Sequence, residues 1–169
     1  MTKHFEDLIP IFGMNDWLFN CALEGISEDN ATFKLSNNTN TFRGIAAHLV
    51  ISRQSLGKMT DMGLDLLPSS WNELGEMFEA GFVESENFPT LEEIRSEWQK
   101  LAPKFIERLP NLSNETINRE PPFPLPNMPD ATLADFIKLN VVHESYHLGQ
   151  LALMHKTLTG KGIMTPPAE

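Results

Sequence analysis

The chain of 169 residues is 41% hydrophobic, which is typical of one globular domain that can bury its own core. Its 13 basic and 23 acidic residues give a net charge of −10, which disfavours nucleic acid and anionic membrane surfaces as partners because clustered Lys and Arg bind both. A single cysteine, Cys21, excludes a disulfide framework within the chain and a multi-cysteine zinc site, and the lack of a signal-peptide pattern or a long apolar span predicts a cytoplasmic protein outside the membrane.

The first part of the chain contains two segments with helical periodicity. The first spans residues 5–26, where Pro10 and Gly13 are expected to break or delay the helix. Residues 27–40 are rich in Ser, Asn, Thr and Asp, which predicts a loop. Apolar residues then recur on one face over residues 41–63, and this pattern predicts a second helix that ends by Gly63.

The middle of the chain is mixed until a third helix begins. A short helix or an ordered loop is expected near residues 71–74 and 77–78. Thr90, with Glu93 three residues later, has the form of a capping box and predicts the start of the third helix. Pro103 falls inside that helix, where it predicts a kink or an early end.

The last part of the chain combines a proline tract with the longest periodic segment. Residues 120–129 contain five prolines and must form an extended crossing loop. A fourth helix is expected to open at Thr132, with Asp135 completing its cap, and to stop at Gly160. Four helical segments with no strand-like alternation between them predict an all-α fold, an antiparallel four-helix bundle with at least one long connection.

Three histidines lie on stripes that otherwise carry apolar side chains. His143 and His147 are four residues apart and therefore point the same way from one helix, and His48 lies in an earlier helix. An imidazole buried without a partner carries a desolvation cost, so something must satisfy these rings. Two explanations are open: the three rings hold one divalent metal, or each makes a hydrogen bond to a backbone carbonyl or a buried water.

The letters of residues 143–147 also match the HExxH pattern of zinc metalloproteases, in which Glu144 would be the general base. Against this interpretation, no Asp or Glu follows His147 before Glu169, and too little chain remains to form a protease cleft. His155 is the only downstream imidazole, and it lies about 12 Å further along the helix, too far to reach the same ion. His4 is expected to be solvated near a frayed end.

A few other residues carry weaker expectations. Trp17, Trp71 and Trp98 are expected to make core or dimer contacts. Gly149 weakens the middle of its helix, which predicts close approach by a neighbouring helix. Gln150 is either a polar partner for the histidines or merely an exposed residue.

Taken together, these motifs resemble the DinB and YfiT-like superfamily of metal-dependent bundle proteins. The resemblance rests on residues 47–49 (Ala-His-Leu) in the second helix, on the HxxxHxGQ signature from His143 to Gln150, and on Gly160. It implies a four-helix bundle with a long crossover, commonly a homodimer. It also implies that His48, His143 and His147 correspond to the family's metal triad, which usually holds nickel or zinc. Some relatives transfer low-molecular-weight thiols.

A site with three histidine ligands leaves coordination positions open, which is typical of catalytic rather than structural metal centres. We therefore expect a metal-dependent enzyme, either a hydrolase or a low-molecular-weight thiol transferase, that acts on a small molecule. The alternative is a noncatalytic metal-binding or stress-response interaction protein. No residue beyond the three ligands is assigned a catalytic role, although Glu144 and Gln150 are candidates.

Overall fold

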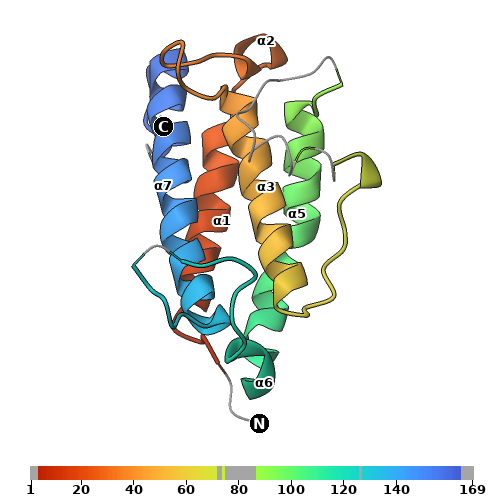
Figure 1. Ribbon diagram of the computed structural model, residues 1–169. Helices are drawn as coiled ribbons and strands as arrows, with labels where there is room; N and C mark the ends of the chain where they lie inside the picture. The colour runs from red at the N-terminus through yellow and green to blue at the C-terminus, as the bar shows by residue number, and fades with distance from the viewer. Residues whose placement is uncertain (1–3, 72–73, 75–86, 126, 165–169) are drawn as a thin grey trace.

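The computed structural model describes residues 4–71, 74, 87–125 and 127–164, and it contains four long helices arranged side by side (Figure 1). The all-α bundle with a long crossover that the sequence predicts is confirmed. The long helices are α1 (Ile9–Leu23), α3 (Phe42–Met59), α5 (Leu91–Arg108) and α7 (Leu133–Thr159). The shorter elements are α2 (Glu28–Ala31), η1 (Ser69–Trp71), η2 (Leu109–Asn111) and α6 (Asn114–Ile117).

The four long helices run in two opposite directions. Helices α1 and α7 run one way, and α3 and α5 run the other way (Figure 1). Helix α1 packs on α5, and helix α7 packs on α3. The parallel helices α1 and α7 also pack on each other, as do α3 and α5. Helix α3 therefore ends at the opposite end of the bundle from the start of α5, so the long crossover falls between Met59 and Leu91. The proline tract was expected to make this crossing, but it joins α5 to α7 at a single end of the bundle (Figure 1).

Local sequence signals explain where the helices begin and end. Pro10 occupies the first turn of α1 and delays its start to Ile9, as expected. Thr90 and Glu93 form the predicted capping box of α5. At the start of α7, the Asp135 carboxylate accepts hydrogen bonds from the backbone N–H and the hydroxyl of Thr132. Gly160 ends α7 with a φ of 74°, a left-handed conformation that favours glycine.

Helix α3 ends at Met59, before Gly63 as expected. Other boundaries differ from the expectations. Helix α5 continues past Pro103 to Arg108, so the early end that this proline predicted is wrong; packing on α1 and α3 holds the segment helical. One helical turn, α2, interrupts the loop expected over 27–40. Of the short helix expected near 71–78, only residues 71 and 74 lie within the described part.

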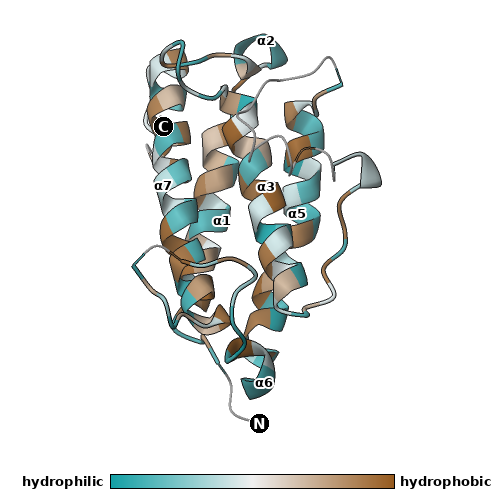
Figure 2. Cartoon of the chain, viewed as in Figure 1, coloured by the Kyte–Doolittle hydropathy of each residue, from teal (hydrophilic) through white to brown (hydrophobic). Residues whose placement is uncertain are grey.

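Aromatic side chains fill the centre of the bundle. Phe12, Phe19, Trp98 and Phe105 are fully buried, and the rings of Phe19 and Trp98 stack with their centroids 4.2 Å apart. Figure 2 shows apolar and polar residues interspersed along each long helix, as expected for helices that bury one face. Trp17 is the exception among the tryptophans because 47% of it is exposed. No helix among the described residues combines the length and apolar character needed to cross a membrane.

Candidate metal centre

The antiparallel pair of helices α3 and α7 brings the three predicted histidines together. His48 comes from the middle of α3, and His143 and His147 come from successive turns of α7. The Nε2 atoms of His48 and His143 are 2.9 Å apart, and one ligand nitrogen from each of the three rings lies within 4.8 Å of the other two. The ring centroids are between 4.6 and 4.9 Å apart. Side chains from two distant parts of the chain thus converge on one point.

The electrostatic environment keeps all three imidazoles neutral. Burial, followed by the neighbouring His147 and His143, lowers the pKa of His48 to about 3. Burial also lowers the pKa of His143, and His147 lowers it further. The pKa of His147 is lowered by burial as well, although its hydrogen bond to the amide oxygen of Gln150 opposes this effect. A neutral imidazole has a free lone pair, so the cluster is ready to bind a cation near neutral pH.

The cluster passes a simple test of fit for a metal ion. With imidazole bonds of about 2.1 Å, two ligand nitrogens on one ion are about 3.0 Å apart at a right angle and about 3.4 Å apart at the tetrahedral angle, and the two Nε2 atoms, 2.9 Å apart, are close to this range. His143 Nδ1 is buried and has no hydrogen-bond partner among the described residues. All three side chains are half-buried, so a bound ion would keep a route to solvent. The donor set suits zinc, nickel, copper or iron.

Gln150 holds one ring of the cluster in place. Its Oε1 is 2.7 Å from His147 Nδ1, and its Nε2 donates a hydrogen bond to the Tyr146 hydroxyl at 3.3 Å. An Nδ1–H that donates to this amide oxygen leaves His147 Nε2 as the acceptor, available for a metal. The structure thus places Gln150 next to the cluster, as a polar partner of His147.

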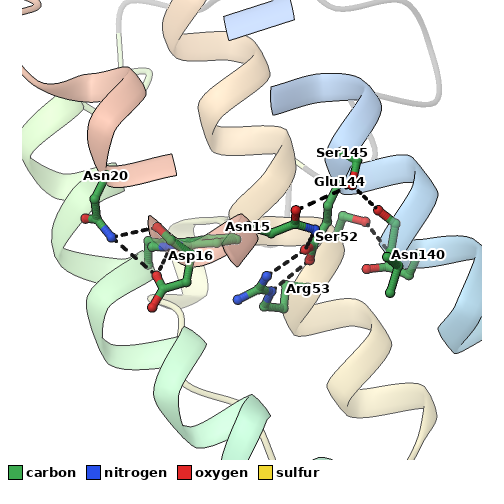
Figure 3. Close-up of polar contacts among 10 residues, drawn as sticks. Asn15, Asp16, Asn20, Ser52, Arg53, Asn140, Glu144 and Ser145 are labelled. Atoms are coloured by element: carbon green, nitrogen blue, oxygen red, sulfur yellow. Dashed lines mark hydrogen bonds and ion pairs between the residues drawn. The ribbon is translucent and has the colours of Figure 1, made fainter. Parts of the chain in front are cut away.

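Glu144 faces away from the cluster, into the core of the bundle. Its side chain is fully buried and accepts two hydrogen bonds from Arg53, at 2.7 and 2.6 Å, and one from Asn15 Nδ2 at 3.1 Å (Figure 3). A carboxylate held by a buried guanidinium is not free to take a proton from water at a metal. The structure therefore excludes the general-base role that the HExxH pattern assigns to Glu144.

Arg53 is enclosed by aromatic rings. Its guanidinium carbon lies 4.0 Å from the ring centroid of Trp98, 5.3 Å from that of Phe12 and 5.6 Å from that of Phe105. Such contacts stabilise a cation through the negative faces of the rings. The ion pair with Glu144 joins α3 to α7 beside the histidines, because Glu144 follows His143 directly.

The two remaining histidines do not join the cluster. His155 is buried, and its Nδ1 lies 2.9 Å from the carbonyl oxygen of Ala22, the arrangement of a core histidine with a satisfied ring. Its expected separation from the cluster is therefore confirmed. His4 lies near Pro110, whose carbonyl oxygen accepts its backbone N–H, at the end of the bundle.

Comparisons with known proteins identify the family. The sequence model of the DinB superfamily matches residues 18–151, a segment that contains all three histidines. The chain belongs to the DinB superfamily. The crystal structure of a DinB-like protein from Bacillus subtilis has the same fold, with a TM-score of 0.59 and 16% sequence identity over 90% of this chain and 92% of that one. No curated protein sequence matches the chain.

In this DinB-superfamily chain, sequence reasoning missed the buried polar residues that surround the histidines. Arg53 and Asn15 lie on helices whose pattern is dominated by apolar residues, and an arginine inside an apolar stripe is the signal that could have indicated a buried partner. The close approach of a neighbouring helix expected at Gly149 is not found within the chain. This glycine is exposed, and no described atom lies within 4 Å of the position its Cβ would take.

Proposed function

We propose that this protein is a metal-dependent enzyme in which His48, His143 and His147 hold one divalent ion, with nickel or zinc as the leading candidates. The observation that carries the proposal is the convergence of three neutral, half-buried imidazoles at one point between α3 and α7. Three protein ligands leave positions open for water or substrate.

The surroundings of the cluster favour an enzyme over a closed structural site. His143 also forms part of the wall of a pocket of about 500 Å³, so a small molecule can reach the side of the cluster. A metal in such a site lowers the pKa of a bound water or thiol and thereby supplies hydroxide or thiolate near neutral pH. Hydrolysis of a small substrate and transfer of a low-molecular-weight thiol are the two reactions that this chemistry supports.

The chain's own residues have clear tasks in this proposal. The three imidazoles bind the ion in their neutral form, and Gln150 orients His147 through its Nδ1. Glu144 positions α7 against α3 through Arg53 and takes no part in proton transfer. The rival function is a noncatalytic metal-binding or stress-response protein in which the ion only tightens the bundle.

Elemental analysis tests the metal site. Protein purified without a metal-binding tag should contain about one equivalent of a transition metal, and both His48→Ala and His143→Ala should lose it. His4→Ala is the matched control, because His4 lies outside the cluster, and it should keep the metal. If the native chain takes up neither zinc nor nickel after incubation, the proposal is wrong. Water exchange is then measured on the metal-loaded protein. A metal-bound water that exchanges with solvent would favour the enzyme, and a metal without one would favour the noncatalytic protein.

We also propose that the protein forms a homodimer through the outer face of α1 and α7. Met14 and Trp17 on α1 are 53% and 47% exposed, and Leu153 on α7 is 55% exposed. Gly149 lies exposed on the same helix as Leu153, and its missing side chain would let another helix approach. Helices α1 and α7 pack side by side, so these residues form one apolar surface.

Sedimentation velocity tests the dimer. The native chain should sediment as a dimer, and Met14→Glu should shift it to a monomer because it places a charge in the apolar surface. Leu35→Glu is the control, since Leu35 is 41% exposed but lies in the loop before α3. A native chain that sediments as a monomer at high concentration would overturn this proposal without affecting the metal site.

A further inference from the structure

The pocket beside the histidine cluster has an apolar wall that metal binding does not explain. Helix α7 and the proline tract supply this wall. Tyr146 and Val142 are each 64% exposed, and Phe123 is 45% exposed. The Phe123 ring packs edge-on against Phe136, with their centroids 5.2 Å apart, so the tract forms one side of the pocket. An apolar ligand that fills the pocket would cover this surface and displace water from it.

The polar side of the pocket is small and carries no charge. It consists of His143, Ser52 and Asn140. Figure 3 shows Ser52 on α3 facing Asn140 on α7, and the Asn140 Nδ2 donates a hydrogen bond to the Ser52 hydroxyl at 3.4 Å. Asn140 is only 4% exposed, and its Oδ1 has no hydrogen-bond partner among the described residues. A buried amide oxygen without a partner is costly, and a donor on a ligand would satisfy it once the Asn140 side chain turns this oxygen, which is closed to solvent here, toward the pocket.

We propose that this pocket binds the uncharged, ring-containing part of the substrate, with one hydrogen-bond donor directed at Asn140. The absence of Asp, Glu, Lys and Arg from the described pocket wall disfavours an ionised group there, because its charge would have no partner. The inference rests on the proposed function, since His143 belongs to both the pocket and the cluster and places the reacting end of such a molecule beside the metal site.

Binding to the pocket is measured first on the full chain stripped of metal with a chelator. Titration by ¹⁹F NMR compares 4-fluorophenol, which carries a donor, with 4-fluoroanisole, which lacks one. We expect both to bind, and the phenol to bind roughly three- to tenfold tighter because it donates to Asn140. Leu139→Gln and Phe123→Ala should each weaken both ligands about fivefold or more. Leu35→Gln, an exposed leucine outside both the pocket and the proposed dimer surface, should leave both affinities unchanged.

Three results would overturn the inference: no binding of either compound, equal affinities for the two, or equal weakening by Leu139→Gln and Leu35→Gln. A conversion of a native dimer to monomer by Leu139→Gln would also overturn it, since a second copy of the chain would then be the occupant of this surface.

The link to the metal is measured separately on zinc- or nickel-loaded protein. Benzohydroxamic acid should bind more than tenfold tighter than acetohydroxamic acid, because both carry the same metal-binding head and only the first has a ring. Equal binding of the two hydroxamates would refute the placement of the pocket next to the reacting end. A chain that holds no metal refutes the proposed function, whereas the fluorophenol titration on metal-free protein still decides the pocket.

Discussion

The buried ion pair between Arg53 and Glu144 should dominate the stability of the bundle once either partner is removed. Both side chains are fully buried, and the guanidinium donates two hydrogen bonds to the carboxylate. Glu144→Ala would leave a buried cation with no counter-charge, and its Nη1 already lacks a hydrogen-bond partner among the described residues. The aromatic rings around Arg53 offset only a part of that loss.

The expected cost can be worked out from these contacts. Removal of one partner of a buried pair costs about 3–5 kcal/mol, because the remaining charge is stranded out of water. For a chain of this length, the loss corresponds to a fall in Tm of roughly 10 °C. A double variant, Arg53→Met with Glu144→Leu, replaces the pair by apolar groups of similar size and strands no charge. It should lose less stability than the single variants Arg53→Met and Glu144→Leu combined, with a coupling of at least about 2 kcal/mol.

Urea unfolding followed by circular dichroism, on metal-free protein, measures these values in a double-mutant cycle. Asp65→Ala is the matched control, because it breaks the ion pair between Lys58 and Asp65, whose side chains are 43% and 76% exposed. This control should change the free energy of unfolding by less than about 1 kcal/mol. The reasoning is refuted if Glu144→Ala costs no more than Asp65→Ala, or if the single losses simply add in the double variant.

Three further predictions concern the cluster and the glycines. The pKa of His48 is lowered to about 3, below its unfolded value of about 6.5, so the unfolded state binds more protons in acid. The free energy of unfolding of metal-free protein should therefore fall as the pH drops from about 6.5 towards 3, by up to about 1.4 kcal/mol per pH unit, and urea titrations of His48→Gln should show a smaller slope. Gln150→Ala should weaken zinc binding about 10- to 100-fold in a competition titration with a chelating dye, whereas unchanged affinity would show that this amide does not orient its ring. In the monomeric chain, Gly149→Ala should raise the free energy of unfolding by up to about 1 kcal/mol, because its Cβ meets open space within the chain and alanine gains helix propensity. Gly57→Ala should lower the free energy of unfolding by about 1–3 kcal/mol, because its Cβ would lie 2.7 Å from a methyl carbon of Leu64. Equal changes in urea unfolding for the two glycine variants would contradict this prediction.

Short-range features of this fold could be predicted from the sequence. The capping box at Thr90 and the stop at Gly160 depend on residues only a few positions apart, and both are confirmed. The convergence of the histidines was also within reach, because the spacing of His143 and His147 fixes their common face and the family signature points to His48.

Long-range features could not be predicted in the same way. The partner of Glu144 lies 91 residues away on α3, and no local pattern records which helices become neighbours. The location of the crossover depends on which connection runs the length of the bundle, whereas the proline content of residues 120–129 records only that this tract is not helical. Pro103 shows the same limit, since tertiary packing overrides its helix-breaking tendency.

The separation of the histidines along the chain has a consequence for synthesis of the protein. His48 and His143 are 95 residues apart, and α7 is made after the other three long helices. During translation the nascent chain therefore cannot offer the complete cluster until α7 has left the ribosome. An ion that needs all three rings would bind only chains in which α7 has already packed on α3. It would therefore stabilise the folded protein rather than direct its folding.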